Sequence, residues 1–218
     1  ELPGGLNRIE YQADPFQSRR PFDRFDGNRI GTSLKFKWQP NKNHEFSAIS
    51  YYMHTYRTSI IASNKGDSPS DIDQFVEQPR IYDVTALEPR YTWRANAKSR
   101  PIYNDLNIGI RGALELANLS QFTRDAGGRI QTVDDDGRLG AIAGYIEDQL
   151  HLLDDRLVIG GGIRFEGVVA SRRANLERNV LTRSYYEPLP AVSMWFSPVE
   201  GFALFADYAH SFGPPQFL

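Results

Sequence analysis

The chain has 218 residues, a formal net charge of -2 and no cysteine. The absence of cysteine excludes a disulfide framework and a thiolate metal site, and the small net charge argues against a nucleic-acid partner. No run of eighteen or more apolar residues is present, so no segment has the pattern of a membrane-spanning helix. The fold class must therefore be inferred from shorter patterns.

Three stretches of the chain alternate almost without a break between apolar and polar side chains, over residues 28–38, 102–116 and 156–168. A period of two predicts β-strands with one apolar and one polar face. The polar face is predicted to hold Lys35, Arg111 and Arg164, and the apolar face Leu34, Ile110 and Ile163. Five further stretches are strand-like but less regular, over residues 44–59, 84–94, 137–152, 183–196 and 202–212.

The connections between these stretches alternate between short and long. The short ones cover residues 39–43, 95–101, 153–155 and 197–201. The long ones cover residues 62–83, 117–136 and 169–182, and residues 1–27 are expected to form a fourth, extracellular loop. An up-and-down sheet with tight turns at one end and long loops at the other is typical of an outer-membrane β-barrel.

The predicted fold is therefore all-β, an antiparallel up-and-down transmembrane β-barrel. Trp38, Trp93, Trp195 and Phe196 lie next to the short turns, where an aromatic girdle is expected at the membrane interface. A soluble β-sandwich also has alternating strands, but its strands are usually shorter and its loops show no systematic change in length.

Motifs of enzymes and metal sites are missing from the sequence. There is no Gly-x-Ser-x-Gly elbow, no phosphate-binding loop and no His-Glu-x-x-His helix. The four histidines, which are His44, His54, His151 and His210, do not have metal-ligand spacing. We therefore expect no catalytic residues, no resident metal and no cofactor.

Arginines near the long connections are the candidate binding residues. Arg57 is the first candidate, because it stands where a strand meets a loop, and the others are Arg19, Arg20, Arg80 and Arg172. Guanidinium groups bind carboxylates through two parallel hydrogen bonds, so several at a barrel mouth predict a site for a polycarboxylate or another anionic chelate. The alternative is that these arginines are solvated or paired with nearby acids such as Asp23 and Glu77.

Several short motifs occur in an order that resembles one family of membrane proteins. They are Leu2-Pro3-Gly4-Gly5-Leu6, Arg20-Pro21-Phe22-Asp23, Tyr145-Ile146-Glu147-Asp148-Gln149, Gly162-Ile163-Arg164-Phe165-Glu166, Glu187-Pro188-Leu189-Pro190-Ala191 and Ser211-Phe212-Gly213-Pro214-Pro215-Gln216-Phe217. Together they resemble the TonB-dependent outer-membrane siderophore receptors, in particular the ferric citrate type. The resemblance covers nearly the whole chain.

This resemblance implies a 22-stranded barrel, plugged by an N-terminal domain, in the bacterial outer membrane. Residues 1–218 would then be a partial barrel domain of about eight strands, with the plug domain and the C-terminal strands absent. A closed barrel of only eight strands is the alternative. If the chain is part of a larger sheet, its edge strands have unpaired backbone groups when it is taken alone, and lipid does not tolerate such groups.

The function implied by the resemblance is TonB-dependent import of a ferric chelate, ferric citrate or a similar carboxylate siderophore. The expected partners are that siderophore, the TonB protein through regions outside this chain, and the lipid and lipopolysaccharide of the outer membrane. Two alternatives remain at this point, a passive porin-like channel and an outer-membrane hydrolase. A plug domain upstream in the complete reading frame would favour the receptor over both.

Overall fold

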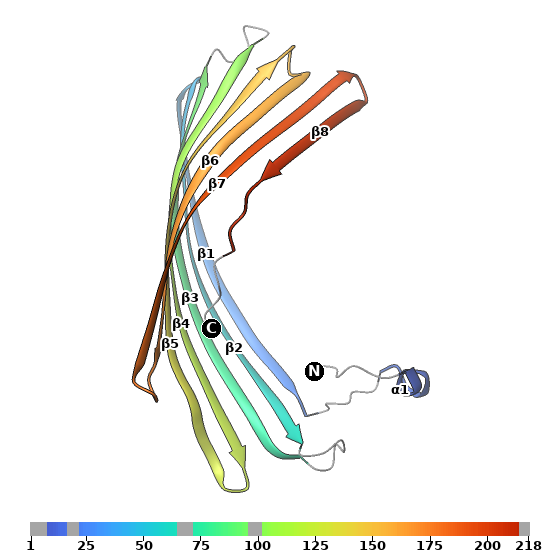
Figure 1. Ribbon diagram of the computed structural model, residues 1–218, viewed down its shortest axis with the longest axis vertical. Coiled ribbons are helices and arrows are strands. Elements are labelled where there is room, and N and C mark those ends of the chain that lie inside the picture. The colour runs from blue at the N-terminus through green and yellow to red at the C-terminus, as the bar shows by residue number, and fades with distance from the viewer. Residues whose placement is uncertain (1–7, 17–21, 65–71, 96–101, 214–218) are drawn as a thin grey trace.

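The computed structural model describes residues 8–16, 22–64, 72–95 and 102–213. These residues form one short helix and a single curved antiparallel sheet, in which each strand is hydrogen-bonded to the next along the chain (Figure 1). The elements are α1 (Arg8–Ala13), β1 (Arg24–Asn41), β2 (His44–Asn64), β3 (Ile72–Ala95), β4 (Tyr103–Asp125), β5 (Gly128–Leu152), β6 (Leu157–Ala174), β7 (Asn179–Val199) and β8 (Phe202–Ala209). The predicted all-β, up-and-down arrangement of about eight strands is confirmed.

The strands extend much further than the sequence pattern predicted. Residues 117–136 were expected to form a loop, but β4 continues to Asp125 and β5 begins at Gly128, so only Ala126 and Gly127 separate them. Gly128 has a φ of 124°, which favours glycine at this tight turn. Residues 169–182 likewise belong mostly to β6 and β7. The backbone ladder continues through polar residues because its hydrogen bonds do not depend on the polarity of the side chains.

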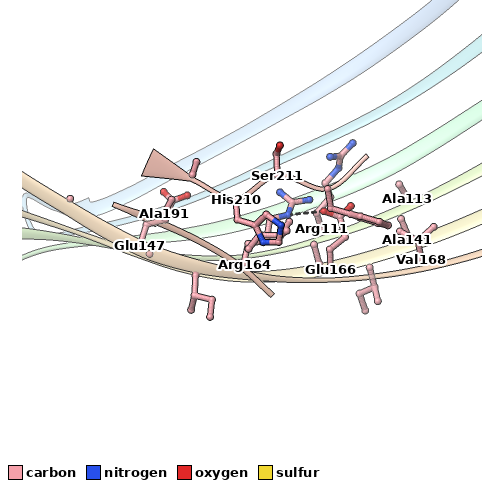
Figure 2. A pocket seen from close by; sticks show the side chains of 18 of the residues that line it. Arg111, Ala113, Ala141, Glu147, Arg164, Glu166, Val168, Ala191, His210 and Ser211 are labelled. Carbon is pink, nitrogen blue, oxygen red and sulfur yellow. Dashed lines mark hydrogen bonds and ion pairs between the residues drawn. The ribbon is translucent and has the colours of Figure 1, made fainter. Parts of the chain in front are cut away.

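The ladder also fixes which side chains share a face, because residues directly opposite each other point the same way. Arg111 pairs with Ala143, which pairs with Glu166, and Arg164 pairs with Tyr145. Figure 2 shows Arg111, Arg164 and Glu166 on the same side of the sheet as His210. His210 belongs to the segment after β8, which crosses the concave side of the sheet (Figure 1). The predicted polar face is therefore the concave face.

The convex face carries the large apolar side chains. Leu34 is 73% exposed and Ile110 is 56% exposed, as expected for residues that face lipid in a barrel wall. The buried apolar residues lie on the concave side of the ladder and are Ala86, Ala117, Ala143, Tyr145, Val168 and Leu189. The curvature crowds the side chains on that side and spreads those on the convex side.

An apolar band crosses the convex face between two polar or aromatic borders. On β3 the band runs from Trp93 to Asp83, and ten residues at roughly 3.4 Å each, tilted by about 45°, span about 25 Å, the height of the apolar band of an outer-membrane barrel. At the border next to the short turns, the ring of Phe46 packs between two others, with its centroid 5.4 Å from that of Trp38 and 4.8 Å from that of Tyr91. Of the aromatic residues predicted for the girdle, Trp38, Trp93 and Phe196 are on the convex face, whereas the register places Trp195 on the concave face.

The described residues contain no helix that is both long and apolar enough to cross a membrane.

Candidate ligand-binding site

Two of the predicted arginines meet on the concave face, between the apolar band and the end of the sheet opposite the short turns, which is the lower end in Figure 1. Arg57 of β2 lies directly opposite Arg80 of β3 in the ladder. The two strands pair along nearly their whole length, so this register is held by many backbone hydrogen bonds. Both side chains line one open groove of about 810 Å³.

A third arginine lines the same groove and was not identified as a site residue from the sequence. Arg29 of β1 pairs with Thr55, and Thr55 pairs with Tyr82. Arg29 therefore lies one row nearer the short turns than Arg57. Its position on the polar face of its strand followed from the alternation, but its height relative to Arg57 depends on the register. We refer to Arg29, Arg57 and Arg80 as the arginine cluster.

Arg57 is held in place by an uncharged partner. Its Nη2 donates a hydrogen bond of 3.0 Å to Oη of Tyr82, and its guanidinium carbon lies 5.0 Å from the centroid of that ring. A cation over an aromatic face is stabilised without losing its charge. Arg57 is therefore orientated in advance, which lowers the entropic cost of binding a ligand.

The positive charge of the arginine cluster is not neutralised within the described part of the chain. No ion pair among those residues includes Arg29, Arg57 or Arg80, and Glu115 is the carboxylate that shares their groove. Like charges placed opposite each other on neighbouring strands are destabilising. An anion in the groove would relieve this repulsion.

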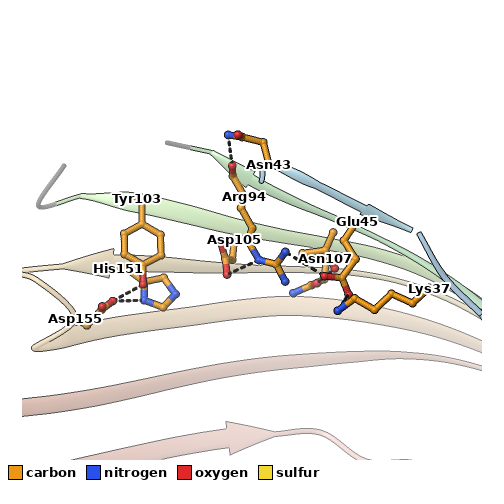
Figure 3. Close-up of polar contacts among 10 residues, drawn as sticks. Lys37, Asn43, Glu45, Arg94, Tyr103, Asp105, Asn107, His151 and Asp155 are labelled. Carbon is orange, nitrogen blue, oxygen red and sulfur yellow. Dashed lines mark hydrogen bonds and ion pairs between the residues drawn. The ribbon is translucent and has the colours of Figure 1, made fainter. Parts of the chain in front are cut away.

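Near the short turns, in contrast, cations of the concave wall are paired with acids. Glu45 pairs with Lys37 at 3.0 Å and with Arg94 at 3.1 Å, and Arg94 also lies 3.9 Å from Asp105 (Figure 3). These cations are therefore already neutralised by acids of the same wall. Figure 3 also shows His151 and Tyr103 converging on Asp155.

Most charged side chains in the middle of the wall also have partners there, although Lys35 and Arg111 form no ion pair within the described residues. Tyr145 accepts a hydrogen bond of 2.8 Å from Nε of Arg90 and donates one of 3.2 Å to Glu88. Arg164 pairs with Glu166 at 3.2 Å (Figure 2). The arginine cluster thus differs from the rest of the wall because three unneutralised guanidinium groups gather in one groove.

The remaining predicted site residues are less favourably placed. Arg172 lies on the concave face in the same row as Tyr82, three strands away, at roughly 14 Å by the spacing of strands. It pairs with Asp135 at 2.6 Å, and Asp135 is only 4% exposed. Arg19 and Arg20 lie outside the described residues.

Side chains of metal-binding type do not gather within the described residues. No group of three or more His, Asp or Glu side chains there could hold a metal ion. The chemistry that the arginine cluster supports is electrostatic capture of an anion.

Comparisons with known proteins agree with this architecture. A family model described as "TonB dependent receptor-like, beta-barrel" matches residues 2–218. The chain resembles a crystal structure of the ferric citrate transporter FecA in the unliganded form, with a TM-score of 0.82 and 27% identity over 95% of this chain and 31% of that chain. The chain thus spans about a third of the length of that structure.

Two further structures share the fold at lower identity. The open form of the ferric-catecholate import receptor Fiu from E. coli K12 matches with a TM-score of 0.70 and 13% identity, over 90% of this chain and 37% of that chain. BauA, the ferric preacinetobactin receptor from Acinetobacter baumannii, matches with a TM-score of 0.68 and 8% identity, over 85% of this chain and 30% of that chain.

The match over residues 2–218 bears out the family resemblance of the motifs, the outer-membrane location and the assignment to a family of transporters rather than enzymes. The chain belongs to the TonB-dependent receptor-like β-barrel family.

Proposed function

We propose that this chain is part of a receptor that captures a ferric polycarboxylate chelate, such as ferric citrate, and imports it in a TonB-dependent step. The observation that carries the proposal is the unneutralised arginine cluster on the concave wall above the apolar band. In a closed barrel the concave wall lines the interior. The cluster would then face a ligand arriving from outside the cell.

The chemistry of the cluster suits carboxylates. A guanidinium group presents two parallel N–H donors that match the two oxygens of a carboxylate, and three such groups suit a ligand with several carboxylates. The likeness to a ferric citrate transporter at 27% identity supports the same class of ligand. Arg19 and Arg20 are proposed as further contacts, and Arg172 as a contact only if a ligand displaces it from Asp135.

Energy coupling belongs to parts of the receptor outside this chain. We propose that a plug domain and further strands complete the barrel, and that the plug connects the receptor to the TonB protein. Release of the chelate inward would follow rearrangement of the plug. A passive, anion-selective pore would also place arginines on its inner wall, so a requirement for TonB is what distinguishes the receptor from such a channel.

Uptake of radioactive iron tests this proposal. The full-length receptor containing this chain is expressed in cells that lack their own ferric citrate receptor, with and without a functional TonB protein. We expect iron uptake from ferric citrate only when TonB is present, and no uptake from a ferric catecholate.

Uptake of ferric citrate that is equally fast without TonB would support a passive channel. Uptake of the catecholate alone would contradict the proposed carboxylate ligand. Outer-membrane levels of the receptor, measured by immunoblot in each strain, serve as the control for expression.

A further inference from the structure

Glu115 of β4 is the one carboxylate, among the described residues, that lines the groove of the arginine cluster. Its position follows from the register, because Leu119 lies opposite Arg80 and Glu115 comes four residues earlier in the same strand. Four residues at roughly 3.4 Å each place the backbone of Glu115 about 14 Å nearer the short turns than the backbone of Arg80. The groove therefore has a cationic end and an anionic end.

The nearest side chains on the concave wall give Glu115 no hydrogen-bond partner. Val84 and Leu139 lie opposite it on the neighbouring strands, and Ala113 and Ala117 flank it on the same face of β4. None of these four side chains can donate a hydrogen bond. Glu115 is half-buried, and its side chain forms no ion pair or hydrogen bond with the part of the chain that the structure describes. Its carboxylate is thus open to a ligand in the groove.

Glu115 also lies where the groove of the arginine cluster meets a second groove. The second groove, of about 940 Å³, extends from Glu115 towards the short turns, and Met53, Val84 and Leu139 line both grooves. These three residues and Glu115 form one row across β2, β3, β4 and β5. A ligand that extends from the arginine cluster along its groove therefore meets Glu115 at the inner end.

A carboxylate at this point discriminates between ligands by the hydrogen bonds that they can donate. A ligand that fills the groove displaces water from Glu115, and leaving a half-buried charge without hydrogen bonds is costly. A carboxylate of the ligand cannot replace the water, because ionised carboxylates only accept hydrogen bonds and repel each other. An amide N–H or an ammonium group of the ligand can replace it.

We propose that Glu115 selects, among ferric carboxylate chelates, those that turn carboxylates to the arginine cluster and an N–H donor to the opposite end of the groove. Amides of citrate with a diamine are chelators of this kind, because each amide brings one N–H group. This role rests on the proposed function, since it concerns the ligand of the same groove. In a site that recognises carboxylates alone, Glu115 would only weaken binding, because like charges at an interface are unfavourable.

Two synthetic chelators test this role in isothermal titration of the purified full-length receptor. One is the diamide of 1,4-diaminobutane with two citrates, and the other is the matching diester of 1,4-butanediol. The two chelators have the same carboxylates and hydroxyls, and ester oxygens replace the amide N–H groups in the diester. We expect the ferric diamide to bind the wild-type receptor at least about tenfold more tightly than the ferric diester, because the diester loses a hydrogen bond to a charged group.

Variants of Glu115 separate its role from intrinsic differences between the two chelates. Glu115→Leu removes both the charge and the acceptor from apolar surroundings, so the preference for the diamide should disappear and the diester should bind more tightly than it binds the wild type. Glu115→Gln keeps an acceptor without the charge, so its preference for the diamide should be intermediate.

Glu187→Leu is the matched control. Glu187 is a half-buried carboxylate of the same concave wall, three strands away on β7, and it does not line the groove of the arginine cluster. Its removal should leave the preference for the diamide unchanged. In Arg57→Gln/Arg80→Gln both chelates should bind more weakly, while the preference for the diamide remains.

The failure of this role and the failure of the proposed function give different results. If the two arginines prove necessary but Glu115→Leu keeps the wild-type preference, or if the wild type has no preference, the role of Glu115 is wrong and the proposed function stands. A receptor that binds neither chelate would contradict the role of Glu115, and one that also fails to bind ferric citrate would contradict the proposed function.

Discussion

Replacing Ile110 with arginine should sharply reduce assembly of the receptor in the outer membrane. Ile110 is 56% exposed on the convex face and pairs with Gly144 near the middle of the apolar band. An arginine at the lipid-facing midplane of a barrel costs about 2 to 4 kcal/mol. The measurement is the fraction of heat-modifiable, folded receptor in outer-membrane preparations, together with urea unfolding of the protein in liposomes.

Arg111→Ala is the control, one position along the same strand. Arg111 points to the concave face, and its only side-chain hydrogen bond within the described residues is a long one, 3.4 Å to Oη of Tyr51. We expect this variant to assemble nearly as well as the wild type. If Ile110→Arg and Arg111→Ala assemble equally well, the assignment of the two faces is wrong.

The second large effect concerns ligand affinity. Arg57→Gln/Arg80→Gln should weaken binding of ferric citrate by at least about a hundredfold, because each hydrogen bond to a charged group contributes roughly 1.5 to 3 kcal/mol and 1.4 kcal/mol corresponds to a factor of ten. Removing the two charges also removes repulsion between them, so assembly should not suffer. The measurement is isothermal titration of ferric citrate into the purified full-length receptor.

Lys42→Gln/Arg156→Gln removes the same charge from two short turns at the other end of the sheet, and its affinity should equal that of the wild type. Arg29→Gln alone should show a loss smaller than that of the double variant. Wild-type affinity in Arg57→Gln/Arg80→Gln would remove these two arginines from the site.

For the regular strands, the side chains that point to the lipid-facing side of the sheet could be predicted from the sequence alone. Lipid selects apolar side chains at alternate positions, so Leu34, Ile110 and Ile163 were correctly assigned to one face. The ends of the strands could not be predicted in this way. Above the apolar band the convex residues are polar, as Asn118 and Asp136 are, so the alternation disappears although the backbone ladder continues.

The arginine cluster could be predicted only in part. Arg57 and Arg80 were identified because the sequence pattern placed them at the edge of a long loop, but this placement was wrong, since β2 continues to Asn64 and β3 begins at Ile72. That the two arginines face each other depends on the register of β2 and β3. Arg29 was missed for the same reason, since nothing local relates its height to theirs. Ion pairing is equally non-local, and only the structure shows that Arg172 is neutralised by Asp135.

Chemical protection of a single cysteine tests the central claim, that the chelate binds at the arginine cluster. Thr55 lies between Arg29 and Tyr82 in the ladder and lines the same groove, so Thr55→Cys places a thiol inside the proposed site. A ligand at ten times its Kd leaves a site free for only about a tenth of the time, so ferric citrate should slow labelling by a water-soluble thiol reagent about tenfold. Gly127→Cys, in the turn between β4 and β5, should not be protected. Unchanged labelling of Thr55→Cys, while the same protein binds ferric citrate with wild-type affinity, would contradict the account.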